Sequence, residues 1–177
     1  MAGQGVSGTW SAVVEWSRYG PNAVLLRFAD KLGDEAYERG RAVADELEQR
    51  PPLGVVEFVP AYTTVLIEFH PREVPRLDDW VHSLIARLDA ALATQRPPAP
   101  VKEIPIVYDG EDLERIARHS GLTVEEVRAL HSAPIYKVYV LGFSPGFPYL
   151  GDLDARLRAP RLPNPRPRVP AGSVAIG

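Results

Sequence analysis

An internal repeat is the feature that most limits how this chain can fold. Apolar, β-rich runs at residues 12–19 and 23–28 are separated by Gly-Pro-Asn, a turn signal, which indicates a hairpin. The same pattern returns at an offset of 41 to 43 residues, so the chain carries two copies of one structural unit. The matching segments are residues 13–16 (VVEW) with 55–58 (VVEF) and residues 24–28 (VLLRF) with 65–69 (VLIEF).

A helical pattern follows each copy of the hairpin. Residues 34–49 place four apolar side chains roughly on one face: Ala36, Tyr37, Val43 and Leu47. Residues 77–93 place another four at helical spacing: Trp80, Leu84, Leu88 and Ala91. A strand pair cannot bury its apolar face alone. The ββαββα order therefore predicts a two-layer domain, one antiparallel sheet with both helices on one side.

The chain divides into two predicted domains of the α+β class. Residues 1–9 are rich in Gly and Ser and are expected to be disordered, and structure is expected to begin at Trp10. The ββαββα domain then occupies residues 10–93. Residues 94–100 (TQRPPAP) have the composition of a semi-rigid linker. Residues 101–177 form the second domain.

The second domain is predicted to mix strands with short helices. Its strands are expected over residues 101–108, over residues 135–143 and from residue 172 onward, and its helices over residues 112–119 and 123–131. Gly121 is a candidate C-cap, and Thr123 with Glu126 forms a capping box. The sequence stops at Gly177, within an apparent strand, which would leave a ladder unpaired.

Composition excludes several classes of function. The formal charge of -3 gives no basic field for a phosphate backbone, so nucleic acid is not expected as a partner. The absence of cysteine rules out disulfides and thiol nucleophiles, and the four histidines are too scattered to form a metal-binding pair. No signal-peptide pattern is present, and no run approaches the ~18 apolar residues of a membrane span. A cytoplasmic protein without a membrane partner is expected.

One motif suggests a serine nucleophile and is rejected on three grounds. Residues 142–146 (GFSPG) fit the G-x-S-x-G pattern of a nucleophile elbow. However, Pro145 has no backbone N–H to stabilise an oxyanion, every histidine precedes Ser144, and no amphipathic helix follows. The glycine spacing also lacks the Lys-Ser/Thr of a phosphate loop. No self-contained ATP site or other cofactor site is evident, and the catalytic residues stay unassigned.

Residues 141–172 are the most unusual stretch of the sequence. They interleave three aromatic residues with Gly and Pro, and then present Arg158, Arg161, Arg166 and Arg168 on a proline-stiffened backbone. Prolines restrict such a loop, while glycines let its backbone approach a ligand or partner closely. Aromatic and arginine side chains on a rigid loop are typical interface anchors. Internal packing of the loop remains the other interpretation.

The same stretch resembles the signature of a known family. The elements are Gly-Phe-x-Pro-Gly-Phe at residues 142–147 and Pro-Arg…Val-Pro-Ala-Gly-Ser-Val ending at Val174, with similar segments upstream at residues 104–108 and 125–132. The family groups subunit 1 of allophanate hydrolase, the B subunit of 5-oxoprolinase and the sporulation-kinase inhibitor KipI. The candidate substrate- or partner-binding residues are His131, Phe143, Pro145, Gly146, Phe147, Tyr149, Arg161, Arg166, Arg168, Gly172 and Ser173.

The resemblance covers nearly the whole chain and carries an expectation about the fold. It implies an N-terminal ββαββα domain followed by a cyclophilin-like β-barrel. Family members continue beyond the segment matched here, so the barrel is expected to be incomplete at its C-terminus. One departure is visible, because His70-Pro71 stands where the family pattern leads us to expect Asp-Pro.

The resemblance also implies a function. It predicts subunit 1 of a heteromeric hydrolase that acts with a subunit 2 partner, and with a third lactam-hydrolase subunit, on a small amide or lactam. The complex, rather than this chain, is expected to use ATP, and the chain is expected to be inactive alone. The alternative is a KipI-like regulatory protein that binds and inhibits a histidine kinase, and the sequence does not separate the two.

Overall fold

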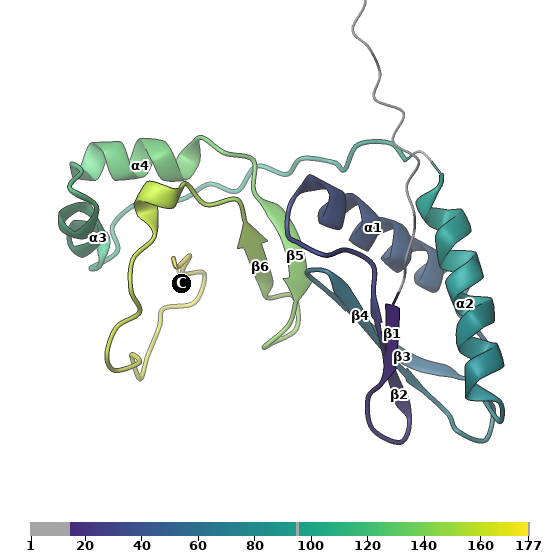
Figure 1. Cartoon of the computed structure of the whole chain (residues 1–177). Coiled ribbons are helices and arrows are strands. Elements are labelled where there is room, and N and C mark those ends of the chain that lie inside the picture. The colour runs from purple at the N-terminus through teal and green to yellow at the C-terminus, as the bar shows by residue number, and fades with distance from the viewer. Residues whose placement is uncertain (1–14, 95, 177) are drawn as a thin grey trace, which may run out of the picture. The chain divides into compact units, whose positions relative to one another are not determined.

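The computed structural model describes residues 15–94 and 96–176, which form two compact units (Figure 1). Unit 1 comprises the described residues up to Pro98 together with Val138–Tyr149. Unit 2 comprises Ala99–Lys137 and the described residues from Leu150 onward. The predicted disordered segment 1–9 and the predicted start of structure at Trp10 lie outside the described residues. No helix in the described ranges is long and apolar enough to cross a membrane.

The repeat in the sequence corresponds to a symmetric sheet in unit 1. The sheet holds four antiparallel strands in the order β1-β2-β4-β3, with β2 and β4 as central neighbours and one edge strand from each copy. The register sets Leu25 opposite Leu66, so equivalent strands of the two copies meet at the middle. Pro60 lies on edge strand β3, where a residue without an N–H is tolerated. The strands are β1 (Glu15–Arg18), β2 (Ala23–Arg27), β3 (Val55–Ala61) and β4 (Thr64–Phe69).

Helices α1 (Asp34–Gln49) and α2 (Leu77–Leu92) close one core with the sheet. Every second residue of the central strands is buried in this core, as the period of two in a half-buried strand requires. Leu84 and Leu88 of α2 are buried as the spacing predicts, and Trp80 packs against the same cluster. The described chain is thus a mixed α/β structure with antiparallel sheets, as predicted at that level.

The predicted linker is fastened to unit 1. Arg96 donates from Nη1 to the Ala91 carbonyl oxygen at 2.7 Å, and its Nε lies 3.4 Å from a carboxylate oxygen of Asp45. Arg41 donates from Nη2 to the Pro97 carbonyl oxygen at 3.2 Å. Proline composition predicted the stiffness of this segment, but not the arginine contacts that hold it against α1 and α2.

A hairpin that the sequence indicated only in part belongs mainly to unit 1. Strand β5 (Lys137–Leu141) is shorter than the predicted run of residues 135–143, and it pairs with β6 (Pro148–Gly151), which composition indicated as loop. A proline can occupy the first residue of a strand, so Pro148 does not prevent pairing. The Tyr62 N–H donates to the Tyr139 carbonyl oxygen at 3.2 Å and joins the hairpin to the β3–β4 turn.

Unit 2 is built on a small core. Helices α3 (Leu113–Ser120) and α4 (Val124–Ser132) and the 3₁₀ helix η1 (Ala155–Leu157) enclose four buried apolar side chains. The capping box predicted at Thr123 and Glu126 is present with both of its hydrogen bonds. Gly121 adopts a φ of 66° after α3, the left-handed C-cap that its position predicted. The buried side chains are Ile116, Ala117, Val127 and Leu157.

Two predicted strands of the second domain are not formed, and that part of the prediction is wrong. Residues 101–108 and the segment from Gly172 to Ile176 contain no strand. Both carry apolar residues of high β-propensity, but a strand also needs a neighbouring ladder to satisfy its N–H and C=O groups. Within the described residues there is no closed barrel. The cyclophilin-like barrel and the domain limits at residues 93 and 101 stay predictions.

Candidate functional site

The β5–β6 hairpin exposes three aromatic rings that contact one another in series. The Phe143 and Phe147 centroids lie 5.7 Å apart and the Phe147 and Tyr149 centroids lie 5.2 Å apart, both with edge-to-face geometry. Phe143 is 91% exposed, Phe147 42% and Tyr149 39%. We call Phe143, Phe147 and Tyr149 the aromatic ladder. Three candidate site residues are therefore brought together by the fold.

The loop at the tip of the hairpin is closed by its own backbone. The Gly142 N–H donates to the Phe147 carbonyl oxygen at 3.1 Å, and the Phe147 N–H donates to the Ser144 carbonyl oxygen at 3.1 Å. Gly146 has a φ of 76° and Phe143, unusually for a bulky residue, a φ of 66°. Strand β6 follows this loop where a nucleophile elbow would have a helix. Ser144 is thus a residue of a hairpin loop, flanked by Pro145.

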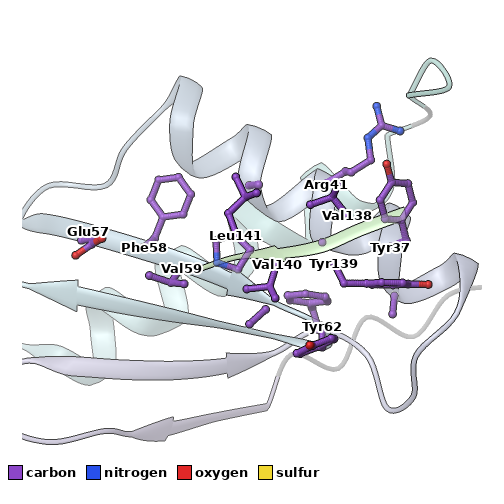
Figure 2. Close-up of a pocket in the computed structure, with 16 residues that line it drawn as sticks. Tyr37, Arg41, Glu57, Phe58, Val59, Tyr62, Val138, Tyr139, Val140 and Leu141 are labelled. Atoms are coloured by element: carbon purple, nitrogen blue, oxygen red, sulfur yellow. The ribbon is translucent and has the colours of Figure 1, made fainter. Parts of the chain in front are cut away.

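An open groove of about 410 Å³ lies within unit 1, between α1, β3 and β5 (Figure 2). Tyr139 of β5 lies between Tyr37 of α1 and Tyr62 of the β3–β4 turn, with ring centroids 6.0 Å and 6.3 Å away. Arg41 sits 6.0 Å from the Tyr37 ring centre. The sequence pattern placed Tyr37 on the apolar face of its helix and gave no sign of the groove, because the groove depends on where β5 packs.

His131 lies in unit 2 between two tyrosines. Its Nδ1 is 2.7 Å from the Tyr108 hydroxyl oxygen, and the Tyr136 hydroxyl donates to the His131 carbonyl oxygen at 2.8 Å. Burial lowers the pKa of His131 below its ordinary value of 6.5, so the ring is neutral at pH 7. His131 Nδ1 and the Tyr108 hydroxyl therefore share one hydrogen bond between neutral groups. Together with the Tyr136 contact, this hydrogen bond orders the C-terminal turn of α4.

The arginines of the C-terminal loop occupy different environments. Arg166 reaches both carboxylate oxygens of Asp112, with Nη2 3.0 Å from Oδ1, and its Nε lies 2.9 Å from Glu111. These hydrogen bonds hold the pKa of Asp112 below its usual value. Arg161 and Arg168 are exposed. Arg166 is thus an anchor within unit 2, while the other two candidates project into solvent.

The last two candidate residues form a turn. Gly172 has a φ of 81°, a conformation that favours glycine. Ser173 donates to the Pro170 carbonyl oxygen from its backbone N–H at 3.2 Å and from Oγ at 2.8 Å. The segment expected to open a strand is therefore folded back on itself. Among the described residues, no group of three or more His, Asp and Glu side chains is placed to hold a metal ion.

Comparison with known proteins agrees with the predicted resemblance. The family model described as "Carboxyltransferase domain, subdomain C and D" matches residues 14–177. The chain is 34% identical over 169 residues to the B subunit of 5-oxoprolinase from Bacillus subtilis (strain 168), which covers 89% of this chain and 70% of that protein. It is 37% identical over 161 residues to the protein of the same name from Escherichia coli O157:H7, with 89% and 72% covered.

A solved structure extends the comparison to the fold. The crystal structure of TTHA0988 matches with a TM-score of 0.76 and 43% identity, over 87% of this chain. The chain spans 30% of the TTHA0988 chain. The family match over almost every residue and the identity to two bacterial relatives support the same assignment. The chain therefore belongs to the family of the 5-oxoprolinase B subunits, which is built on subdomains C and D of the carboxyltransferase domain.

Proposed function

We propose that the chain is subunit 1 of a heteromeric hydrolase that opens the C–N bond of a small amide or lactam together with a subunit 2 partner. The name of the relatives, as the B subunit of 5-oxoprolinase, describes a component of a multi-subunit enzyme. The observation that carries the proposal is the exposed aromatic ladder, because interface anchors are typically aromatic side chains on a rigid support. The chain contributes a docking surface, and the active site is completed by the complex.

The reaction defines what the other subunits supply. Hydrolysis of an amide or lactam adds water across the C–N bond and produces a carboxylate and an amine. The complex uses ATP to drive this step, in the cytoplasm, and a third lactam-hydrolase subunit takes part. No residue of this chain is assigned to attack on the carbonyl. Pro145 and Gly146 shape the tip that presents Phe143, and the candidates outside this tip and the aromatic ladder lie on unit 2, within the proposed cyclophilin-like barrel.

The aromatic ladder is tested by removing two of its rings. Truncation of a buried interface aromatic typically costs ~2 kcal/mol or more, which weakens binding about thirtyfold. Phe147→Ala with Tyr149→Ala is therefore expected to release co-expressed subunit 2 and to abolish ATP-dependent turnover of 5-oxoproline. The matched control is Tyr19→Ala with Leu32→Ala, two exposed apolar residues elsewhere in unit 1. The control should retain both properties.

Three outcomes decide between the interpretations. Loss of the partner in the ladder variant, with normal circular dichroism, supports the proposal. Unchanged co-purification and turnover would show that the aromatic ladder serves only the internal packing of the hairpin. Stable capture of subunit 2 with no turnover of 5-oxoproline or allophanate, but with inhibition of a histidine kinase, would favour the KipI-like regulatory alternative.

A further inference from the structure

The C-terminal part of unit 2 carries a local excess of positive charge. Five arginines and no acidic residue occur between Ala155 and Ile176, in a chain whose formal charge is -3. Arg156 is paired with Asp154 at 2.7 Å, and Arg166 is paired with Asp112 and Glu111. Within the described ranges, no ion pair involves Arg158, Arg161 or Arg168, and all three are exposed. We call residues 158–170 the arginine loop.

The arginine loop is held at several points despite having no secondary structure. Leu157, directly before it, is fully buried. Arg115 donates from Nη1 to the Pro160 carbonyl oxygen at 3.2 Å, and Arg166 is fixed on Asp112 at the start of α3. Five prolines, at positions 160, 163, 165, 167 and 170, restrict the backbone between these points. The loop therefore presents its unpaired guanidinium groups on a preorganised backbone.

This arrangement has a consequence for binding. A cation on a fixed backbone loses less conformational freedom on contact than one on a mobile tail, so more of the electrostatic attraction appears as affinity. Guanidinium groups also pair with carboxylates through two parallel hydrogen bonds. We propose that Arg158, Arg161 and Arg168 bind an acidic patch on subunit 2, with Arg115 and Arg166 acting as positioning residues. This inference rests on the proposed function and names what the partner presents.

Other anionic partners fit the loop less well. A small carboxylate substrate needs a concave site that removes it from water, whereas Arg161 and Arg168 project from an exposed loop. A nucleic acid would meet the negative field of the whole chain and would gain only three phosphate contacts. A folded acidic surface can contact all three arginines together and exclude water from them.

The test measures the affinity of the chain for subunit 2 by biolayer interferometry at about 0.05 M and about 0.5 M NaCl, since exposed charge pairs are screened by salt. Arg161→Ala with Arg168→Ala is expected to weaken binding roughly tenfold at the lower salt concentration, mainly through a slower association rate. The difference from the unchanged protein should shrink at the higher salt concentration. Arg72→Ala with Arg118→Ala removes the same charge from two other exposed positions and should change affinity less than about twofold.

Asp112→Asn separates positioning from net charge. If only net charge mattered, removing a carboxylate from this chain would tighten binding to an acidic surface. Because Asp112 holds Arg166, we expect the opposite, a roughly threefold weaker affinity. Hydrogen exchange of residues 158–170 should also become faster in this variant, while exchange in the α3–α4 core stays slow.

The outcomes distinguish failure of this inference from failure of the proposed function. The assignment of the arginine loop would be overturned if Arg161→Ala with Arg168→Ala and the control Arg72→Ala with Arg118→Ala lost the same affinity for subunit 2, or if neither lost any. Either result would leave the proposed complex intact. Tighter binding by Asp112→Asn would overturn the positioning role. Binding of a single-stranded DNA oligonucleotide that disappears in Arg161→Ala with Arg168→Ala would assign the loop to phosphate instead. Absence of any complex between the unchanged protein and subunit 2 would overturn both proposals.

Discussion

Glu46 is the one acidic side chain that is buried among the described residues, with 4% of its surface exposed. It accepts hydrogen bonds from Arg87 of α2, at 2.8 Å from Nη2 and 3.2 Å from Nε, and it also contacts Arg50. The helical pattern of α1 gave no warning of this burial, because the compensating arginine lies 41 residues later. Local spacing identifies the apolar face of a helix. It does not show which charged residue of that helix will be covered by a second helix that is distant in the sequence.

We predict that Glu46→Gln lowers the free energy of unfolding of unit 1. The substitution leaves Arg87 without its carboxylate, and removing one partner of a buried ion pair typically costs ~3 to 5 kcal/mol. Arg87 is partly exposed, so water can replace some of the loss and we expect about 2 to 3 kcal/mol. Chemical denaturation is the measurement. Glu48→Gln, at an exposed position of the same helix, should change stability by less than about 0.5 kcal/mol.

The same pair predicts a dependence on pH. Burial of Glu46 raises its pKa, but the hydrogen bonds and charges of Arg87 and Arg50 outweigh burial and hold the pKa below the ordinary value of 4.5. A lowered pKa means that the stabilisation is present above pH 4.5 and is lost as pH falls through the folded-state pKa. The stability gap between the unchanged protein and Glu46→Gln should therefore narrow below that pH. A gap that widened in acid would contradict the assignment.

Phe143 shows a second effect at the scale of one residue. Its φ of 66° is strained for a side chain with a Cβ atom, and such strain is often kept where a side chain is needed for function. We predict that Phe143→Gly is more stable than Phe143→Ala by about 1 kcal/mol, because glycine adopts this φ without strain. Both variants should lose affinity for subunit 2 equally. Equal stability of the two variants in thermal denaturation would show that the backbone is relaxed.

At the scale of elements, the sequence predicted those features that depend on nearby residues. Helix α1, the capping box at Thr123 and the C-cap at Gly121 all rest on short-range rules, and the structure contains each of them. Strand β6 and the absent strand at residues 101–108 depend instead on whether a partner strand is available. Composition indicates β-propensity but not where a partner strand lies. The sequence therefore indicated a loop where β6 forms and a strand at residues 101–108, where none forms.

In unit 1 the sequence did indicate which strands pair, because the repeat supplied partner strands as well as residues of high β-propensity. Two copies of one hairpin have only a few ways to share an apolar face, and the predicted single antiparallel sheet is the one observed. The aromatic ladder was predicted only as residues in one loop-like stretch. Its geometry depends on the hairpin, because Tyr149 lies in β6 and Phe147 directly precedes that strand, where its carbonyl oxygen accepts from the Gly142 N–H and its ring contacts Tyr149 edge to face.

The face of α2 can be tested through Trp80. Its ring lies 5.6 Å from Phe69, and its Nε1–H donates to the Leu53 carbonyl oxygen at 3.0 Å. Trp80→Ala is expected to cost ~3 kcal/mol and to lower the Tm of unit 1 by more than about 10 °C. Trp80→Phe keeps most of the ring contact and loses the hydrogen bond, for about 1 kcal/mol. A Tm change of less than about two degrees for Trp80→Ala would mean that α2 packs by another face.

At the scale of the whole molecule, the two units differ in how much apolar surface they bury. The core of unit 1 joins both helices to the sheet and contains most of the fully buried large side chains, including Phe28, Phe69 and Leu88. Unit 2 has four buried apolar residues, of which Leu157 is the largest that is fully enclosed. Because hydrophobic stabilisation scales with the area removed from water, unit 2 should be the less stable of the two.

We therefore predict two unfolding transitions by calorimetry, with unit 2 melting first. Hydrogen exchange should assign them, since amides at Ile116 and Val127 should exchange through the first transition and amides at Val24 and Ile67 only through the second. The proposed contact of subunit 2 with the folded arginine loop predicts that subunit 2, at about 100 times its Kd, stabilises unit 2 by about 2.7 kcal/mol and raises the first transition. Arg161→Ala with Arg168→Ala should reduce that rise without changing the transition of the free chain. A single transition with equal protection in both cores would show that the units unfold as one.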